Sequence, residues 1–156
     1  MVTTKSLEDT THTQLRTPTA YLTHERIEQH DQLGLFLLAK NGFAIDDVRS
    51  MVSTSELYSS LRIINRIIGT RNPRGHRQSD ATPARLNAQQ SAVAYQFARA
   101  LEHAIAVFGT MRLADEWLAR PCRHLAGNSP VDMIDIHFGF RAVEDYLERV
   151  ELGVYQ

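Results

Sequence analysis

The chain has 156 residues, 43% of them hydrophobic and 22% charged, with a formal net charge of -1 and a single cysteine. These values are ordinary for a globular domain with its own core, and one cysteine excludes an intramolecular disulfide. The apolar run from Leu33 to Ala39 is too short to cross a bilayer, and the first residues lack the basic and apolar regions of a signal peptide, so we expect a cytoplasmic protein.

The charges are distributed unevenly along the chain. One stretch holds a single acid, Asp80, among Arg62, Arg66, Arg71, Arg74, Arg77 and Arg85. From Pro130 onward the acids outnumber the bases, with Asp132, Asp135, Glu144, Asp145, Glu148 and Glu151 against Arg141 and Arg149. Two ends of opposite sign predict two different partners.

The first 22 residues are rich in threonine and carry no helical period, so we predict a flexible arm over 1–22. A helix is then expected from Thr23, which can cap it, to Asn41, where Gly42 stops it. Its apolar face is formed by Ile27, Leu35 and Leu38, widened by Phe36 and Leu37.

Two short helices are expected next. The first covers 44–51, and the second begins at Thr54, because Ser53 and Glu56 have the spacing of a capping box. This second helix is expected to bury Leu57 and Leu61. The segment 69–83 that follows is rich in turn formers and arginine.

The strongest helical pattern runs from Ala88 to Phe108. Asn87 and Gln90 can cap its start, and Gly109 ends it. The stripe of apolar residues expected to face the core consists of Val93, Phe97, Leu101, Ile105 and Phe108.

Three further helices are predicted in the C-terminal third. The first, capped by Thr110, turns Leu113, Trp117 and Leu118 inward until Arg120-Pro121 halts it. The second begins at Ser129-Pro130 and closes at Gly139. The third, from Phe140 to Leu152, buries Phe140, Val143, Leu147 and Val150 and exposes Glu144, Asp145, Glu148 and Glu151. Because no segment alternates with a period of two, the predicted fold class is all-α.

Enzyme chemistry finds little support among the residues. The histidines show no pair three or four apart on one helix, so no metal site is predicted, and no glycine-rich phosphate loop suggests a cofactor. Cys122 and His124 could form a ligand or catalytic pair, but a loop thiol and a surface imidazole explain them more simply. We therefore predict that the chain is not an enzyme and uses no cofactor.

The arginine-rich stretch admits two interpretations. Arg62, Arg66, Arg71, Arg74 and Arg77, spread over a helix-turn-helix unit, could neutralise DNA phosphates and read guanine edges. The alternative is a solvated basic face. Pro73 and Gly75 weaken the would-be recognition helix, since proline suits only a first turn.

The chain ends in Leu152-Gly153-Val154-Tyr155-Gln156, which we interpret as an uncapped tail. Apolar groups there need shelter, and they could dock on their own core, on a second copy or in a partner's cavity. The sequence leaves these three possibilities open.

The order of landmarks in the last third resembles the toxin-binding domain of the Xre/MbcA/ParS-like antitoxins. The landmarks are Phe108-Gly109, Trp117-Leu118, Pro121, Leu125, Gly127, Ser129-Pro130, Gly139 and Gly153-Val154-Tyr155. Leu86 to Arg99 looks like the linking helix that precedes this domain, and Ser53 to Arg85 resembles a degenerate Xre-type helix-turn-helix. The resemblance implies an arm over 1–22, a helix-turn-helix region over 23–86, a linking helix over 87–107 and a toxin-binding domain over 108–156.

The resemblance also implies a function. An antitoxin of this kind belongs to a type II toxin–antitoxin system, forms a homodimer, binds operator DNA to repress its own promoter and masks a RES-domain toxin. Such toxins resemble ADP-ribosyltransferases and use NAD, and the antitoxin blocks the cleft where NAD would sit. The residues expected to bind the toxin are Glu144, Glu148, Arg149, Glu151, Leu152, Gly153, Val154 and Tyr155.

A physical mechanism can connect the acidic last helix and the apolar tail with the NAD cleft that the resemblance implies. A cleft that attracts a pyrophosphate should be cationic, so an acidic helix could mimic that charge while the apolar tail fills the rest. Arg149 could pair with a toxin acid or tie the helix to its own domain. Two rivals are a stand-alone helix-turn-helix regulator without a toxin and a small hydrolase that uses Cys122 and His124.

Overall fold

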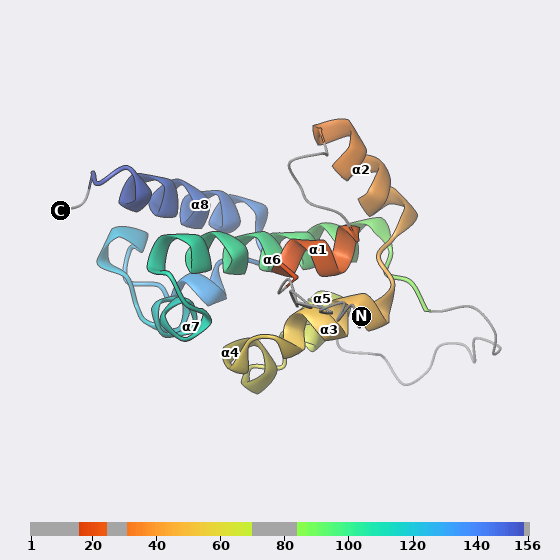
Figure 1. The fold of residues 1–156 in the computed structure, drawn as a ribbon, viewed down its shortest axis with the longest axis horizontal. Helices are drawn as coiled ribbons and strands as arrows, with labels where there is room; N and C mark the ends of the chain where they lie inside the picture. Colours follow the sequence, from red (N-terminus) through yellow and green to blue (C-terminus); the bar gives the residue numbers. More distant parts are fainter. Residues whose placement is uncertain (1–15, 25–30, 70–83, 155–156) are drawn as a thin grey trace, which may run out of the picture.

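The structure, a computed structural model, describes residues 16–24, 31–69 and 84–154, and these residues form an all-α fold (Figure 1). The prediction of the fold class is confirmed. The helices are α1 (Pro18–Thr23), α2 (Gln32–Asn41), α3 (Ile45–Ser53), α4 (Glu56–Ser60), α5 (Ile63–Ile68), α6 (Ala88–Phe108), α7 (Met111–Ala119) and α8 (His137–Glu151), with short 3-10 turns η2 (Arg123–Leu125) and η3 (Pro130–Asp132) between the last two.

Helix α6 forms the centre of the molecule, and α1, α2, α3, α5, α7 and α8 all pack against it. Its bounds agree with the prediction. Asn87 accepts from the Gln90 amide at 2.8 Å while the Gln90 side chain accepts from the Asn87 amide at 3.0 Å, so the predicted capping box is confirmed. Gly109, in the left-handed conformation, ends the helix as predicted.

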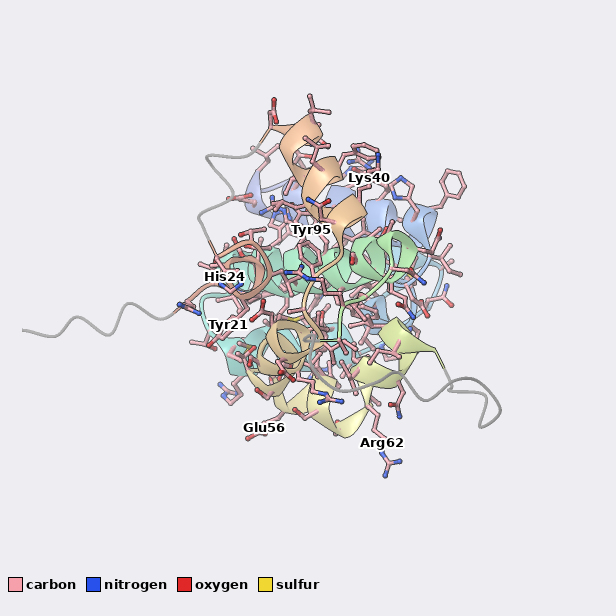
Figure 2. All side chains as sticks on the ribbon, turned by 90° about the vertical axis from the view of Figure 1, so that its right-hand side faces the viewer. Tyr21, His24, Lys40, Glu56, Arg62 and Tyr95 are labelled. Carbon is pink, nitrogen blue, oxygen red and sulfur yellow. The ribbon has the colours of Figure 1, made fainter. Side chains whose placement is uncertain are left out.

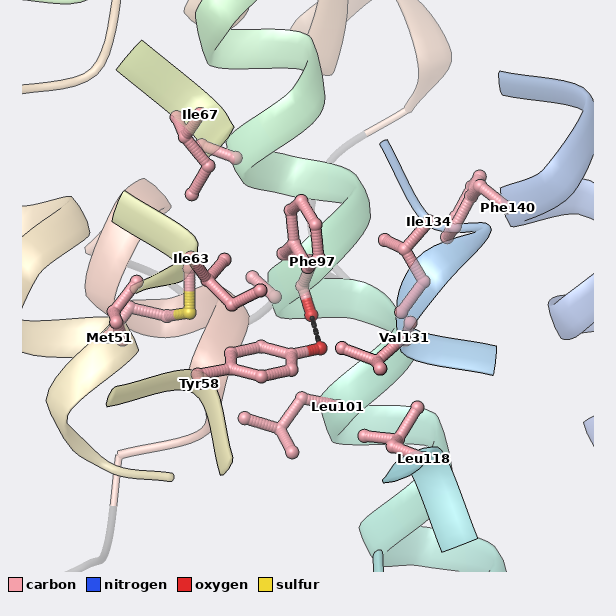
Figure 3. Packing of buried hydrophobic residues seen from close by; sticks show 14 of the residues in the cluster. Met51, Tyr58, Ile63, Ile67, Phe97, Leu101, Leu118, Val131, Ile134 and Phe140 are labelled. Carbon is pink, nitrogen blue, oxygen red and sulfur yellow. Dashed lines mark hydrogen bonds between the residues drawn. The ribbon is translucent and has the colours of Figure 1, made fainter. Parts of the chain in front are cut away.

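The core lies between α6 and the helices α3 to α5. Tyr58 is fully buried, meets the Phe97 ring edge-on at 5.5 Å and donates its hydroxyl to the Phe97 carbonyl at 2.9 Å (Figure 3). Burial raises the pKa of the Tyr58 phenol well above its ordinary value, so the hydroxyl keeps its proton and remains a donor. On the other side of α6, Leu118, Val131 and Ile134 complete the same cluster.

The predicted capping box at Ser53 is wrong. The Ser53 hydroxyl donates back to the Ser50 carbonyl at 2.8 Å, and Ser55 caps α4 by accepting from the Tyr58 amide at 3.0 Å. The helix therefore starts later than expected and turns a different face inward. Tyr58 is buried in place of Leu61, which is exposed.

The prediction of a flexible arm is wrong for residues 18–22. They form most of α1, where Thr19 and Leu22 are buried and the Thr19 amide donates to the Glu102 carboxylate of α6 at 3.0 Å. Thr23 ends α1 and does not cap the next helix, because His24 adopts a left-handed conformation. Helix α2 has its own cap at Asp31, which accepts from the Gly34 amide at 2.7 Å.

The predicted end of α2 is confirmed. Gly42, with φ 82°, follows the last helical residue, Asn41. Helix α3 (Ile45–Ser53) corresponds to the short helix predicted over 44–51. In the C-terminal third of the chain Thr110 caps α7 and the extended Arg120 ends it, both as predicted, although Leu113 is exposed and Trp117 half-buried.

The helix predicted from Ser129-Pro130 to Gly139 is wrong. Before α8 begins at His137 only the 3-10 turn η3 forms, and the Ser129 hydroxyl donates to the Ala119 carbonyl instead of capping. Gly139 lies inside the first turn of α8, where a Cβ would stand 2.2 Å from the Met133 carbonyl oxygen. Glycine is needed because the preceding turn crosses the helix at this point.

Candidate functional site

Helix α8 packs along α6 and runs in the same direction. Near its start, Gln96 of α6 donates to the Ile134 carbonyl at 2.8 Å, and further along both helices His103 meets Glu144 and then Glu151. The residues that α8 buries are Phe140, Val143 and Leu147, as predicted, while Val150 is half-buried. The C-terminal ends of α6 and α8 consequently lie at the same end of the molecule (Figure 1).

A cluster of charged groups ties α8 to α6. The His103 Nδ1 lies 3.1 Å from the Glu144 Oε2, its Nε2 lies 3.4 Å from the Glu151 Oε2, and the Arg99 Nε lies 3.5 Å from the Glu144 Oε2. The hydrogen bond to Glu144 raises the pKa of His103, although burial acts in the opposite direction. The imidazole therefore bridges two carboxylates of α8.

Glu144 does not face outward as predicted. Its side chain is 14% exposed, and its Oε1 is buried without a hydrogen-bond partner among the described residues. The carboxylate faces α6 because His103 and Arg99 are both on that helix. Glu151 differs, since 60% of its side chain is exposed while one oxygen reaches His103.

The tail is capped, and the prediction of an uncapped end is wrong. The Gly153 amide donates to the Val150 carbonyl at 3.0 Å and the Val154 amide donates to the Arg149 carbonyl at 2.9 Å, which together form a Schellman motif. Gly153 has φ 74°, the left-handed conformation that this motif requires. The last described residues are therefore held in one geometry at the end of α8.

This capped end exposes apolar side chains. Leu152 is 72% exposed and Val154 is 63% exposed. Glu148 and Arg149 are exposed in the preceding turn, and Tyr155 lies outside the described residues. The structure thus brings Glu148, Arg149, Leu152, Gly153 and Val154 together at the tip of one helix.

A stack of aromatic rings supports this half of α8. Trp117 lies nearly parallel to Tyr146 at 5.6 Å and meets Phe108 at 5.3 Å, and His124 also stacks on Tyr146 at 5.7 Å. A hollow of about 190 Å³ beside the stack is lined by His124, Tyr146 and Arg149, among others. The rings fix where the tip projects.

Sequence reasoning missed two exposed apolar residues at the opposite end of α8. Ile136 and Phe138 are 64% and 85% exposed. The apolar run before Gly139 looked like the inward face of a helix, and that helix does not form. No local signal indicated the exposure of Ile136 and Phe138, because it depends on the turn before α8, whose Met133 carbonyl packs against Gly139.

The predicted DNA-binding arginines differ in exposure and in contacts. Arg62 is exposed at the start of α5 with φ 50°. Arg66 is instead directed into the fold, 3.0 Å from Asp135 and 3.7 Å from Asp132, with its guanidinium 5.4 Å from the centre of the Phe97 ring. Arg71, Arg74 and Arg77 lie outside the described residues.

The alternative pair Cys122 and His124 shows no arrangement for chemistry. The Cys122 thiol is half-buried, while the His124 ring is stacked on Tyr146. Within the described ranges, no group of three or more His, Cys, Asp and Glu side chains could hold a metal ion. None of the helices described is long and apolar enough to cross a membrane.

Comparison with known families identifies the segment that contains this tip. Residues 103–153 match the family model described as the antitoxin Xre/MbcA/ParS C-terminal toxin-binding domain. The match covers about a third of the chain. The matched segment includes His103, the aromatic stack and helix α8 as far as Gly153. A search among curated proteins finds no match to the chain.

This match supports a role as an antitoxin with a toxin as its partner. The antitoxin role agrees with the expectation drawn from the sequence.

Proposed function

We propose that the chain is the antitoxin of a type II system and that the capped end of α8 enters and blocks the NAD cleft of a RES-type toxin. One observation carries the proposal: Leu152 and Val154 project from a rigid helix end inside the toxin-binding domain. Exposed apolar groups held in a fixed geometry lose little conformational entropy on docking. The end of α8 is therefore preorganised for insertion.

The charges of the tip fit an NAD site. Glu148 is exposed in the last turns, and Glu151 keeps most of its surface open while it touches His103. An enzyme cleft that binds a pyrophosphate needs cationic groups, and acids on α8 can replace that charge. Tyr155 follows as an aromatic anchor of the type enriched in binding hot spots.

The arrangement narrows the set of toxin contacts. We propose Glu148, Arg149, Leu152, Gly153, Val154 and Tyr155 as direct contacts, with Glu151 at the edge of the surface. Glu144 serves a different purpose, since it is directed at His103 and Arg99 and holds α8 in place. It is a positioning residue of this surface.

The test measures NAD consumption by the purified cognate toxin in the presence of the full chain and its variants. We expect a chain truncated after Glu151, and the double variant Leu152→Asp with Val154→Asp, to lose inhibition by at least tenfold. Leu61→Asp is the matched control, because Leu61 is an exposed apolar residue outside the toxin-binding domain. Undiminished inhibition by both tip variants would contradict the proposal that the end of α8 blocks the cleft.

We also propose that the chain forms a homodimer and binds operator DNA, as the resemblance implies. Arg62 is exposed and suits a phosphate contact, whereas Arg66 is engaged by Asp135 and Asp132. In a mobility shift on the promoter of the operon, Arg62→Ala should weaken binding and reduce the slope of log affinity against log salt by about 1. A complex whose affinity does not change with salt would contradict this proposal.

A further inference from the structure

Helix α2 is apolar, yet it is not buried. None of its side chains is buried by the described part of the chain. Its outward face consists of Leu33, Phe36, Leu37 and Lys40, and the three apolar residues are 62%, 58% and 48% exposed. Their spacing, i, i+3, i+4 and i+7, is that of a seam that packs against another helix.

The helix also stands away from the body of the molecule. Figure 1 shows α2 projecting at one end, and Figure 2 shows it above the other helices with Lys40 in its last turn. A groove of about 660 Å³ lies between α2, α6 and α8, and Phe36, Tyr95, His137 and Phe140 are among its lining residues. Helix α2 is thus an apolar ridge beside a groove whose lining also includes Arg99, Arg141 and Glu144.

We propose that α2 pairs with α2 of a second copy, antiparallel, around a two-fold axis near Phe36. A two-fold interface requires one surface to complement itself, and a ridge with an adjacent groove can do so. The charges favour the antiparallel direction. Asp31 caps the start of α2 and Lys40 lies in its last turn, so each acid approaches the lysine of the other copy.

The pairing extends beyond α2. A helix of 10 residues is about 15 Å long and about 10 Å wide, so one face of it covers roughly 150 Å², well below the roughly 800 Å² that each partner buries in a stable interface. His137 and Phe140 line the groove from the α8 side. The surface available for pairing therefore extends from α2 across the groove to the first turn of α8.

The position of this surface leaves the toxin site accessible. The C-terminal end of α8 and helix α2 lie at opposite ends of the molecule (Figure 1). A dimer through α2 would point both α8 tips away from the axis. The interface rests on the homodimer proposed above and does not depend on how the toxin cleft is blocked.

Cysteine cross-linking of the full chain tests both the pairing and its direction. In a Cys122→Ser background, Gln32→Cys chains are mixed with Lys40→Cys chains and treated with a short bismaleimide. The antiparallel pair predicts a mixed product at least fivefold more abundant than either self-linked product, because Gln32 of one copy faces Lys40 of the other. Predominant self-linking of Gln32→Cys would overturn the antiparallel direction. Self-linking of Leu61→Cys measures random collision, and a mixed product no greater than this background would overturn the interface.

Sedimentation of unlinked chains provides the second measurement. The wild-type chain should have twice the monomer mass, Leu33→Glu with Leu37→Glu should have the monomer mass, and Leu61→Glu should remain dimeric. Helical content by circular dichroism shows that the double variant folds. Toxin inhibition is measured in parallel and should persist in that variant, so a failure here is distinct from a failure of the blocking tip. A monomeric wild-type chain, or a double variant that stays dimeric, would overturn the proposal.

Discussion

His103, near the end of α6, and Glu151, in the last turn of α8, lie 3.4 Å apart from Nε2 to Oε2. The same ring contacts Glu144 through its other nitrogen. One imidazole therefore joins α6 to α8 at a point close to the exposed tip.

This contact predicts a specific dependence of stability on pH. The pKa of His103 is raised above its ordinary value of 6.5, chiefly by the hydrogen bond to Glu144, so the native state binds the proton more tightly than the unfolded state. The stabilisation is fully present below pH 6.5 and is lost as pH rises through the native pKa. His103→Gln should lower the free energy of unfolding by about 1 kcal/mol at the acidic side of this window and change it little above the window. Urea unfolding across the window gives the measurement, and an unchanged difference between the two proteins at every pH would refute the link.

Gly139→Ala should destabilise the domain. Alanine normally stabilises a helix interior by about 1 kcal/mol relative to glycine, but here the added methyl would stand 2.2 Å from the Met133 carbonyl oxygen. We expect a net loss of about 1 to 3 kcal/mol from overpacking. Thermal or urea unfolding decides the sign, and a stabilised variant would mean that the turn before α8 can move aside.

Substitutions of Gly153 should separate preorganisation from contact. Alanine in a left-handed conformation costs about 1 to 2 kcal/mol, so Gly153→Ala should weaken toxin binding about five- to thirtyfold. Gly153→Asn tolerates this conformation better and should recover most of the affinity. Calorimetric titration of the toxin measures all three chains. Equal affinities would show that the Schellman geometry does not matter to binding.

Arg66 should contribute to folding more than to DNA binding. A double-mutant cycle of Arg66→Ala and Asp135→Ala is expected to give a coupling energy of about 0.5 to 1 kcal/mol, because both side chains are only partly shielded from water. Arg49→Ala with Asp46→Ala is a suitable control, since that pair is exposed and 3.6 Å apart. A coupling no larger than in the control pair would argue against the internal role.

The accuracy of the sequence predictions depended on how local the deciding interactions were. The ends of α6 were predictable because Asn87, Gln90 and Gly109 act on adjacent backbone groups. Ser53 was predicted to cap α4, but Ser55 caps it, and the Ser55 hydroxyl is held by the carboxylate of Asp115, to which it donates at 2.7 Å. That acid is 60 residues away in the chain, so no local pattern could indicate it.

The same distinction between local and distant interactions applies to the predictions for the candidate site. The sequence left open whether Leu152 and Val154 dock on their own core, and the structure exposes both. The Gly153 that precedes Val154 carried an overlooked signal for a Schellman cap. Glu144 was misplaced because its partner His103 is 41 residues earlier, and an acid on a helix face reads as solvated until its neighbour is known.

The shared direction of α6 and α8 has a consequence for how quickly this chain and the proposed toxin would associate. Each helix dipole places about half a negative elementary charge at its carboxyl end, and here both ends emerge beside the same tip. A positively charged enzyme would be drawn toward that tip from a distance before any atoms touch, so capture should accelerate as ionic strength falls while the dwell time of the complex changes far less.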